Sequence, residues 1–190
     1  MLQRTRNYAR DYIQSSDNGA LQYVGKHYCF SLGESALNRV KRLHAQMLLA
    51  AAALYLSVGL LGSVGFGGEG MPAAAYIVLP YVGLLFPLGL ACGRAALLAK
   101  TQCPLEFAEY DRYLLRQKGV LIVALALAGC LVLGLAALLL ILALRNKTGL
   151  MRELASLAAA ALCWGCIDIA YQQCAILAKN VLSSDFTNNS

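Results

Sequence analysis

Four long apolar runs dominate the pattern of hydrophobic and polar positions along the chain. They cover residues 45–66, 73–99, 119–144 and 154–178. Each run is at least as long as the roughly 20 residues that an α-helix needs to cross a hydrocarbon core of about 30 Å. The connections within the first pair and within the second pair of runs are short, so the paired helices should be antiparallel neighbours. The pattern predicts an all-α integral membrane protein with an antiparallel bundle of four transmembrane helices in residues 45–178.

A polar N-terminal segment, residues 1–44, precedes this transmembrane domain. Residues 7–15 and 21–30 flank an Asp-Asn-Gly turn signal, a pattern that favours a small β-hairpin. The sequence from Ser31 to Glu34 has capping-box spacing, so a juxtamembrane helix should begin near Leu32 and continue into the first span.

The loop between the second and third spans, residues 100–118, also carries helical signals. Pro104 suits the first turn of a helix, and Arg116 and Lys118 suit its negative end. We predict a short interfacial helix in this loop. The chain should end in a short polar tail, residues 179–190.

The charges are distributed unevenly about the four spans. Only 14% of the residues are charged, against roughly a quarter in a soluble domain. Twelve Lys and Arg residues lie on the side of the N-terminal segment, the central loop and the tail, against three in the loop between spans three and four. The positive-inside rule therefore predicts that both termini are cytoplasmic (N-in and C-in). We expect a bacterial cytoplasmic membrane, since organellar targeting features are lacking.

The segment before the first span carries seven basic and three acidic residues, a net charge of +4. Its densest cluster, Arg39, Lys41 and Arg42, directly precedes the first apolar run. Lipid headgroups of an anionic leaflet lie at this level. We predict that these three residues contact that leaflet and that the protein does not bind nucleic acid, which would require a basic face on a folded soluble surface.

Arg94 and Asp168 are the only charged residues within the four apolar runs. A charge near the centre of a membrane costs about 2.5–3.5 kcal/mol on insertion scales, so it is usually paired, hydrated or functional. Counted from Lys100 and Lys179 at about 1.5 Å per residue, the two residues lie about 9 and 16 Å deep. An arginine side chain can span this difference, so we interpret Arg94 and Asp168 as a candidate intramembrane polar pair.

Other polar or irregular positions share the two helix faces that carry this pair. At 100° per residue they are Pro80, Gly83, Pro87 and Thr101 beside Arg94, and Tyr171 and Gln172 beside Asp168. We predict that the two faces meet inside the bundle. One interpretation is a cavity, open to the cytoplasm, that binds or relays an anion or a proton. The other, which we favour, is a buried ion pair that specifies helix packing.

Cys163 and Cys166 form a C-x-x-C sequence within the fourth span. A four-helix membrane protein with such a pair resembles the quinone-linked thiol oxidoreductases of the disulfide-bond-forming and vitamin K epoxide reductase kinds. The resemblance covers one tetrapeptide and the number of helices, and it implies a redox role for these two thiols. The sequence departs from those enzymes because neither predicted outer loop contains the second cysteine pair that they use.

The remaining motifs indicate packing rather than chemistry. Gly89 and Gly93 form a G-x-x-x-G pair, and Gly59 and Ser63 form a second pair of small residues, both of which permit close helix approach. The two histidines have no zinc-ligand spacing relative to the cysteines. We therefore predict no metal, no cofactor and no catalytic residue.

Three classes of function remain open. We favour a non-enzymatic accessory or assembly subunit that binds a membrane-protein partner or another copy of itself. The alternative is a small oligomeric carrier or channel component with Arg94 and Asp168 at its polar centre. The third is a thiol-quinone oxidoreductase that uses Cys163 and Cys166.

Overall fold

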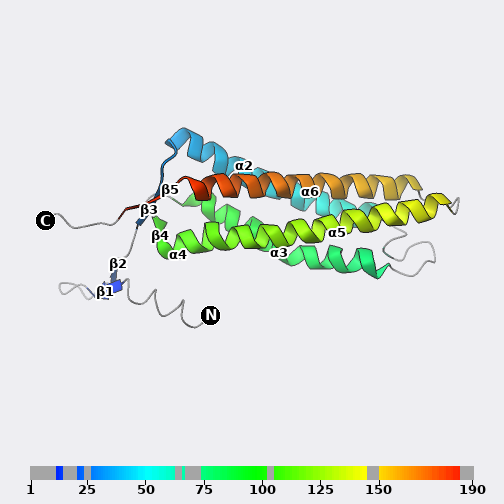
Figure 1. The fold of residues 1–190 in the computed structure, drawn as a ribbon, viewed down its shortest axis with the longest axis horizontal. Coiled ribbons are helices and arrows are strands. Elements are labelled where there is room, and N and C mark those ends of the chain that lie inside the picture. Colours follow the sequence, from blue (N-terminus) through cyan, green and yellow to red (C-terminus); the bar gives the residue numbers. More distant parts are fainter. Residues whose placement is uncertain are drawn as a thin grey trace.

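Four long helices form the body of the computed structural model (Figure 1). The residues that the structure describes are 12–14, 21–23, 27–62, 66, 74–101, 105–144 and 150–184. The long helices are α2 (Glu34–Leu61), α3 (Ala75–Lys100), α5 (Arg116–Leu144) and α6 (Leu150–Lys179). Each helical stretch is long and apolar enough to cross a membrane. This finding confirms the prediction of an integral membrane protein with four spans.

The four helices are arranged as a square. α2 packs against α3 and α6, and α5 packs against the same two helices. α3 and α6 are therefore diagonal to each other, as are α2 and α5. The start of α2, the end of α3, the start of α5 and the end of α6 lie together (Figure 1); we call this the termini end. The opposite ends of the same helices form the loop end.

The buried residues of α2 recur at alternating intervals of four and three positions. They are Leu37, Lys41, His44, Leu48, Ala51, Tyr55 and Val58. The same intervals separate Gln117, Leu121, Ala124, Ala128 and Leu131 on α5. This seven-residue period brings one stripe of each helix to the bundle axis, as in coiled coils and most four-helix bundles. Three of the buried residues at the termini end of these stripes, Lys41, His44 and Gln117, are polar.

A three-stranded antiparallel sheet joins three distant parts of the chain at the termini end. Its strands are β3 (His27–Phe30), β4 (Leu105–Glu106) and β5 (Val181–Ser184), with β3 in the centre. The Tyr28 ring stacks on that of Tyr110, with 4.5 Å between the ring centroids. The sheet therefore connects the segment before α2 to the central loop and to the end of α6. This sheet was not predicted from the sequence.

The predicted N-terminal hairpin is partly confirmed. β1 (Tyr12–Gln14) and β2 (Leu21–Tyr23) pair antiparallel, with Tyr12 opposite Tyr23. The turn signal at residues 17–19 lies outside the described residues. The predicted second strand, residues 21–30, is divided between β2 and β3, and β3 belongs to the three-stranded sheet instead.

Two details of the predicted helices differ from the structure. The first helix begins at Glu34, close to the expected position, but its cap residue Gly33 makes no side-chain capping hydrogen bond. In the central loop, α4 (Phe107–Tyr110) and a π-helical turn, η2 (Asp111–Leu115), lead directly into α5. The helix in this loop is thus continuous with the third span, and a separate interfacial helix is not supported.

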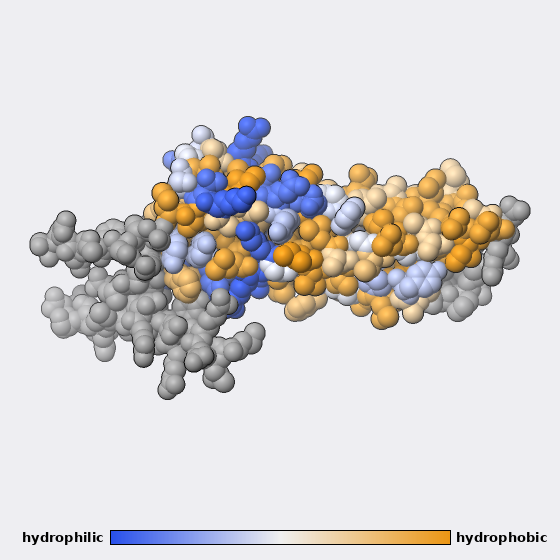
Figure 2. All heavy atoms as spheres, in the orientation of Figure 1, coloured by the Kyte–Doolittle hydropathy of each residue, from blue (hydrophilic) through white to orange (hydrophobic). Residues whose placement is uncertain are grey.

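Hydrophilic residues cluster on the surface of the termini half of the bundle, and hydrophobic residues cover the loop half (Figure 2). On α2 the exposed Arg42 and Gln46 are followed by Leu49, which is 73% exposed, and Leu60, which is 80% exposed. Large exposed leucines are typical of a surface that faces lipid rather than water.

Candidate functional site

A buried polar layer connects all four helices near the termini end. His44 of α2 is fully buried, and its Nδ1 lies 2.8 Å from the carbonyl oxygen of Ala170 on α6. The Gln117 amide nitrogen on α5 lies 3.5 Å from His44 Nε2 and 3.1 Å from the carbonyl oxygen of Ala91 on α3. Each of these contacts joins two different helices.

The partners of His44 determine its protonation state. A carbonyl oxygen can only accept a hydrogen bond, so His44 Nδ1 must carry a proton. The Gln117 amide nitrogen is a donor, so His44 Nε2 must accept. The arrangement therefore requires a neutral imidazole protonated at Nδ1.

Lys41 lies one turn closer to the termini end and points into the protein. Its side chain is 6% exposed, and its Nζ donates to the carbonyl oxygen of Thr101 at 2.9 Å. The same Nζ is 5.3 Å from the centroid of the Phe30 ring. We call Lys41, His44 and Gln117 the interior polar layer.

The position of Lys41 corrects the prediction that it contacts lipid headgroups. Thr101 is the C-terminal cap of α3, and the carbonyl end of a helix attracts cations. The ammonium group is therefore used within the bundle. Arg39 and Arg42 are exposed, as expected for headgroup contact, and they line a surface pocket of about 370 Å³ together with Asn38, Leu43 and Gln46.

Arg94 and Asp168 do not form an ion pair, and the prediction that their helix faces meet is wrong. α3 and α6 are diagonal in the bundle. Because neighbouring helix axes are about 8–10 Å apart, diagonal axes are separated by more than that. Asp168 instead accepts a hydrogen bond from Gln172 of its own helix at 2.7 Å, on the outer surface.

The other positions predicted to accompany this pair are also separated. Pro87 is buried, Pro80, Gly83 and Tyr171 are half-buried, and Gln172 is exposed. The Thr101 hydroxyl donates to the carbonyl oxygen of Leu98 on the same helix at 2.8 Å. This bond stays within α3 and its cap, so it does not join α3 to α6.

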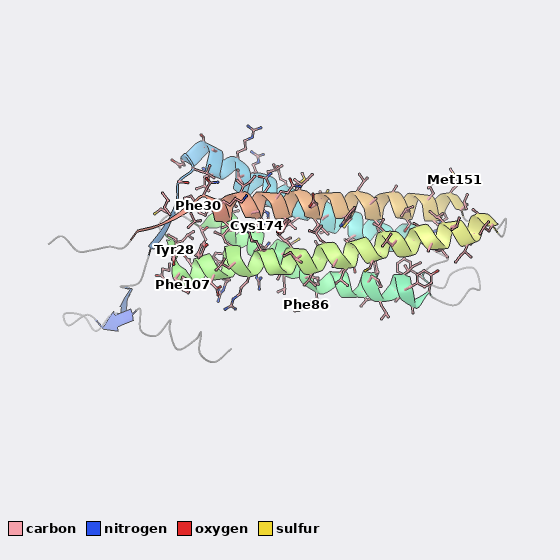
Figure 3. All side chains as sticks on the ribbon, viewed as in Figure 1. Tyr28, Phe30, Phe86, Phe107, Met151 and Cys174 are labelled. Atoms are coloured by element: carbon pink, nitrogen blue, oxygen red, sulfur yellow. The ribbon has the colours of Figure 1, made fainter. Side chains whose placement is uncertain are left out.

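The C-x-x-C cysteines are free thiols. Cys163 is buried, and its Sγ donates to the carbonyl oxygen of Ala51 on α2 at 3.3 Å. Cys174 lies in the interior between helices (Figure 3), where its Sγ contacts the carbonyl oxygen of Leu114 at 3.8 Å. The thiols of Cys163 and Cys174 therefore behave as small core residues with a weak hydrogen-bond donor. Within the described ranges, no group of three or more His, Cys, Asp or Glu could hold a metal ion.

A groove of about 520 Å³ runs along the surface between α3 and α5. All but one of its lining residues are apolar, the exception being Arg116. The lining consists of Gly83, Phe86, Pro87, Leu90, Arg116, Gly119, Val120, Val123 and Leu127. The α3 wall carries Gly83 and Pro87, two of the positions that the sequence placed on the face of Arg94. Phe86 projects outward from α3 at this wall (Figure 3).

Arginines gather at the end of the groove that points to the termini end. Arg116 lines the groove, and Arg94 follows Leu90 by one helical turn on α3. Arg112 and Arg116 lie near enough to Arg94 for their charges to act on it. We call Arg94, Arg112 and Arg116 the lateral arginine cluster.

The π-helical turn η2 orients one member of this cluster. The Arg116 backbone N–H bonds to the carbonyl oxygen of Asp111, five residues earlier. The same widened turn brings Arg116 Nε to 2.9 Å from Asp111 Oδ2. Asp111 is buried, whereas the Arg116 side chain is 51% exposed. The carboxylate therefore holds the guanidinium at the protein surface.

The interior polar layer was not predicted from the sequence, although a signal for it exists. Lys41 and His44 continue the four-and-three spacing of Leu48, Ala51 and Tyr55 beyond the apolar run. Extending that stripe into the polar flank would have placed both residues in the core. A buried polar residue on such a stripe commonly specifies how helices are paired.

The fold places the chain in the class of helical multi-pass membrane proteins. No family model, no curated protein and no solved structure matches the chain.

Proposed function

We propose that the chain is a non-enzymatic accessory or assembly subunit of a membrane complex, and that its termini end binds the partner. The observation that carries this proposal is the sheet β4-β3-β5, which joins three distant segments into one folded surface. Such a surface suits binding because an outer strand offers backbone groups to a further strand. On β5, Leu182 is 62% exposed.

The hydrogen bonds of the interior polar layer support a structural rather than a catalytic role. The donors of His44, Lys41 and the Gln117 amide each bond to a carbonyl oxygen or ring nitrogen of another helix. Such contacts hold a bundle in one arrangement, and they leave these donors occupied. The carrier alternative has less support, because the diagonal placement of α3 and α6 separates Arg94 from Asp168.

We also propose where the membrane lies. The interior polar layer aligns His44 with Ala91, Gln117 and Ala170. At about 1.5 Å per residue, Arg94 and Asp168 then lie within about 5 Å of this level along the bundle.

From this level to the loop end, α3 from Ala75 to Ala91 spans roughly 24 Å and α6 from Leu150 to Ala170 roughly 30 Å, close to the thickness of a hydrocarbon core. In this placement the two charged residues lie at the edge of the core and not near its centre. We propose a bacterial cytoplasmic membrane with the termini end in the cytoplasm, in keeping with the excess of Lys and Arg at that end. A fluorescent protein fused after Ser190 should then fold and fluoresce; a fusion that is exported without fluorescence would reverse the orientation.

The accessory role is tested by the mass of the particle extracted from the protein's own membrane. In a mild detergent we expect a stable assembly with a protein mass above the 20.3 kDa of the chain. Leu182→Asp should release the chain from that assembly, because it places a charge on the proposed contact surface.

A matched control lies at the opposite end of the bundle. Met151 is 76% exposed and lies at the loop end of α6 (Figure 3). Met151→Asp should leave the assembly intact. If the assembly survives Leu182→Asp and is lost with Met151→Asp, the partner binds at the loop end and not at the termini end. A wild-type chain that carries no second protein component would contradict an accessory role.

A further inference from the structure

The groove between α3 and α5 has an apolar floor that faces outward. Phe86 is 73% exposed and Val123 is 52% exposed. The groove stays open at Gly119, where an added Cβ would meet no atom within 4 Å. The floor from Gly83 to Leu90 is about 10 Å long at the usual helical rise. An elongated apolar group fits such a channel better than a compact one.

The termini end of the groove has the opposite character. Arg116 lines it, and Arg94 and Arg112 lie within electrostatic range. Asp111 is the acidic side chain bonded to this cluster, through Arg116. Three guanidinium groups against one carboxylate leave a positive charge at this point of the surface.

Two of these cations, Arg94 and Arg112, have hydrogen-bonding groups that the described part of the chain leaves unoccupied. Arg94 has a buried amino group, Nη1, that finds no hydrogen-bond partner among the described residues. Arg112 is exposed, and the described part of the chain provides no ion pair for it. Guanidinium groups bind phosphate oxygens through two parallel hydrogen bonds, so unoccupied arginines at one point suit a phosphate.

We propose that this groove binds an anionic phospholipid of the surrounding bilayer, with an acyl chain along the apolar floor and the headgroup phosphate among Arg94, Arg112 and Arg116. The order of the two parts matches that of a lipid in a leaflet, because the arginines lie toward the termini end of the groove and the apolar floor toward the loop end. The site is independent of the accessory role and of the residues Arg39 and Arg42 on α2.

Fluorescence quenching by brominated lipids can test the site. The chain has one tryptophan, Trp164 on α6, which is 46% exposed and lies beside Gly129 of α5. A Trp164→Phe, Phe86→Trp variant moves the only tryptophan to the groove. Both proteins are reconstituted into phosphatidylcholine vesicles that contain either brominated phosphatidylglycerol or brominated phosphatidylcholine.

We expect the groove tryptophan to prefer brominated phosphatidylglycerol over brominated phosphatidylcholine. The preference should be about fivefold for each arginine that contacts the phosphate. Trp164 of the wild-type protein should respond equally to the two lipids. Equal quenching of the groove tryptophan by the two lipids would overturn the proposal.

Two matched pairs of variants localise the effect. Arg94→Gln, Arg112→Gln should lower the preference to no more than the roughly fivefold that Arg116 alone supplies, whereas Arg39→Gln, Arg42→Gln, which removes the same charge from α2, should retain it. If both pairs reduce the preference equally, general surface charge explains it and the site is refuted.

Gly119→Leu should fill the floor and lower quenching by both lipids. Gly165→Leu on α6, where an added Cβ would also meet no atom within 4 Å, should leave quenching unchanged. Unchanged quenching with Gly119→Leu would exclude the groove as the position of the acyl chain. Both leucine variants replace a helical glycine, so neither should weaken its helix.

Discussion

The interior polar layer and the lateral arginine cluster lie near the same level of the bundle, yet their hydrogen-bond donors are used in opposite ways. Inside, His44 and Lys41 reach carbonyl oxygens of other helices at 2.8 and 2.9 Å. Outside, Arg94 has a buried amino group without a partner in the described part of the chain, and Arg112 is exposed. Occupied donors stabilise a fold, whereas unoccupied ones are available to a ligand. The difference suggests that the layer maintains the bundle and that the cluster serves recognition.

The largest effect should come from the interior polar layer. His44→Ala removes the bond to Ala170 and the partner of Gln117, and it leaves a cavity. We expect a loss of about 3 kcal/mol in the free energy of unfolding, measured by thermal or denaturant unfolding in detergent. Gln46→Ala, an exposed polar position on the same helix, should change stability little. A similar loss of stability in both variants would mean that the interior polar layer stabilises the bundle no more than an exposed polar residue does.

Two glycines provide a second comparison of inside with outside. A Cβ at Gly59 would collide with the Tyr81 hydroxyl, whereas a Cβ at Gly89 meets nothing within 4 Å. Gly59→Leu should therefore cost about 2 kcal/mol through overpacking, and Gly89→Leu should be neutral or stabilising. Melting temperatures of the two variants in the same detergent give the answer; the reverse order would mean that α3 packs through the Gly89 face.

A smaller loss is expected at the end of α3. Lys41→Met keeps much of the apolar side chain but removes the hydrogen bond to the Thr101 carbonyl. The expected cost is about 1.5 kcal/mol, typical of a hydrogen bond from a charged group. The adjacent exposed Arg42→Met should cost almost nothing in the same unfolding assay. If Arg42→Met is the more damaging change, Lys41 does not stabilise the bundle.

Hydropathy predicted the four spans because lipid requires long continuous apolar helices. It could not predict which helices are diagonal, since the short connections fix only the pairs α2–α3 and α5–α6. Helix order therefore remained open, and with it the contact between Arg94 and Asp168. The seven-residue spacing of buried positions says more than hydropathy about the direction in which a side chain faces. On α6, Asp168 directly follows the buried Ile167 and lies on the outward side of the buried stripe.

The sheet was unpredictable for a different reason. β4 contains only two residues and β5 only four, and they pair with β3 across the whole length of the chain. Strands this short carry little periodicity, and their pairing depends on the bundle having brought the three segments together. The groove was likewise hidden, since α3 supplies one wall and α5 the other. Its basic end was visible only as Arg94 in the second span and Arg116 in the loop.

The most direct test of the contrast between the two polar groups is the shift in melting temperature that phosphatidylglycerol produces relative to phosphatidylcholine. A ligand that binds the folded state raises its stability. The wild-type protein and the weakened His44→Ala variant should both gain several degrees, whereas Arg94→Gln, Arg112→Gln should begin at the wild-type melting temperature and gain much less. A full shift in the arginine variant, or its loss in His44→Ala alone, would contradict the division into a structural layer and a recognition cluster.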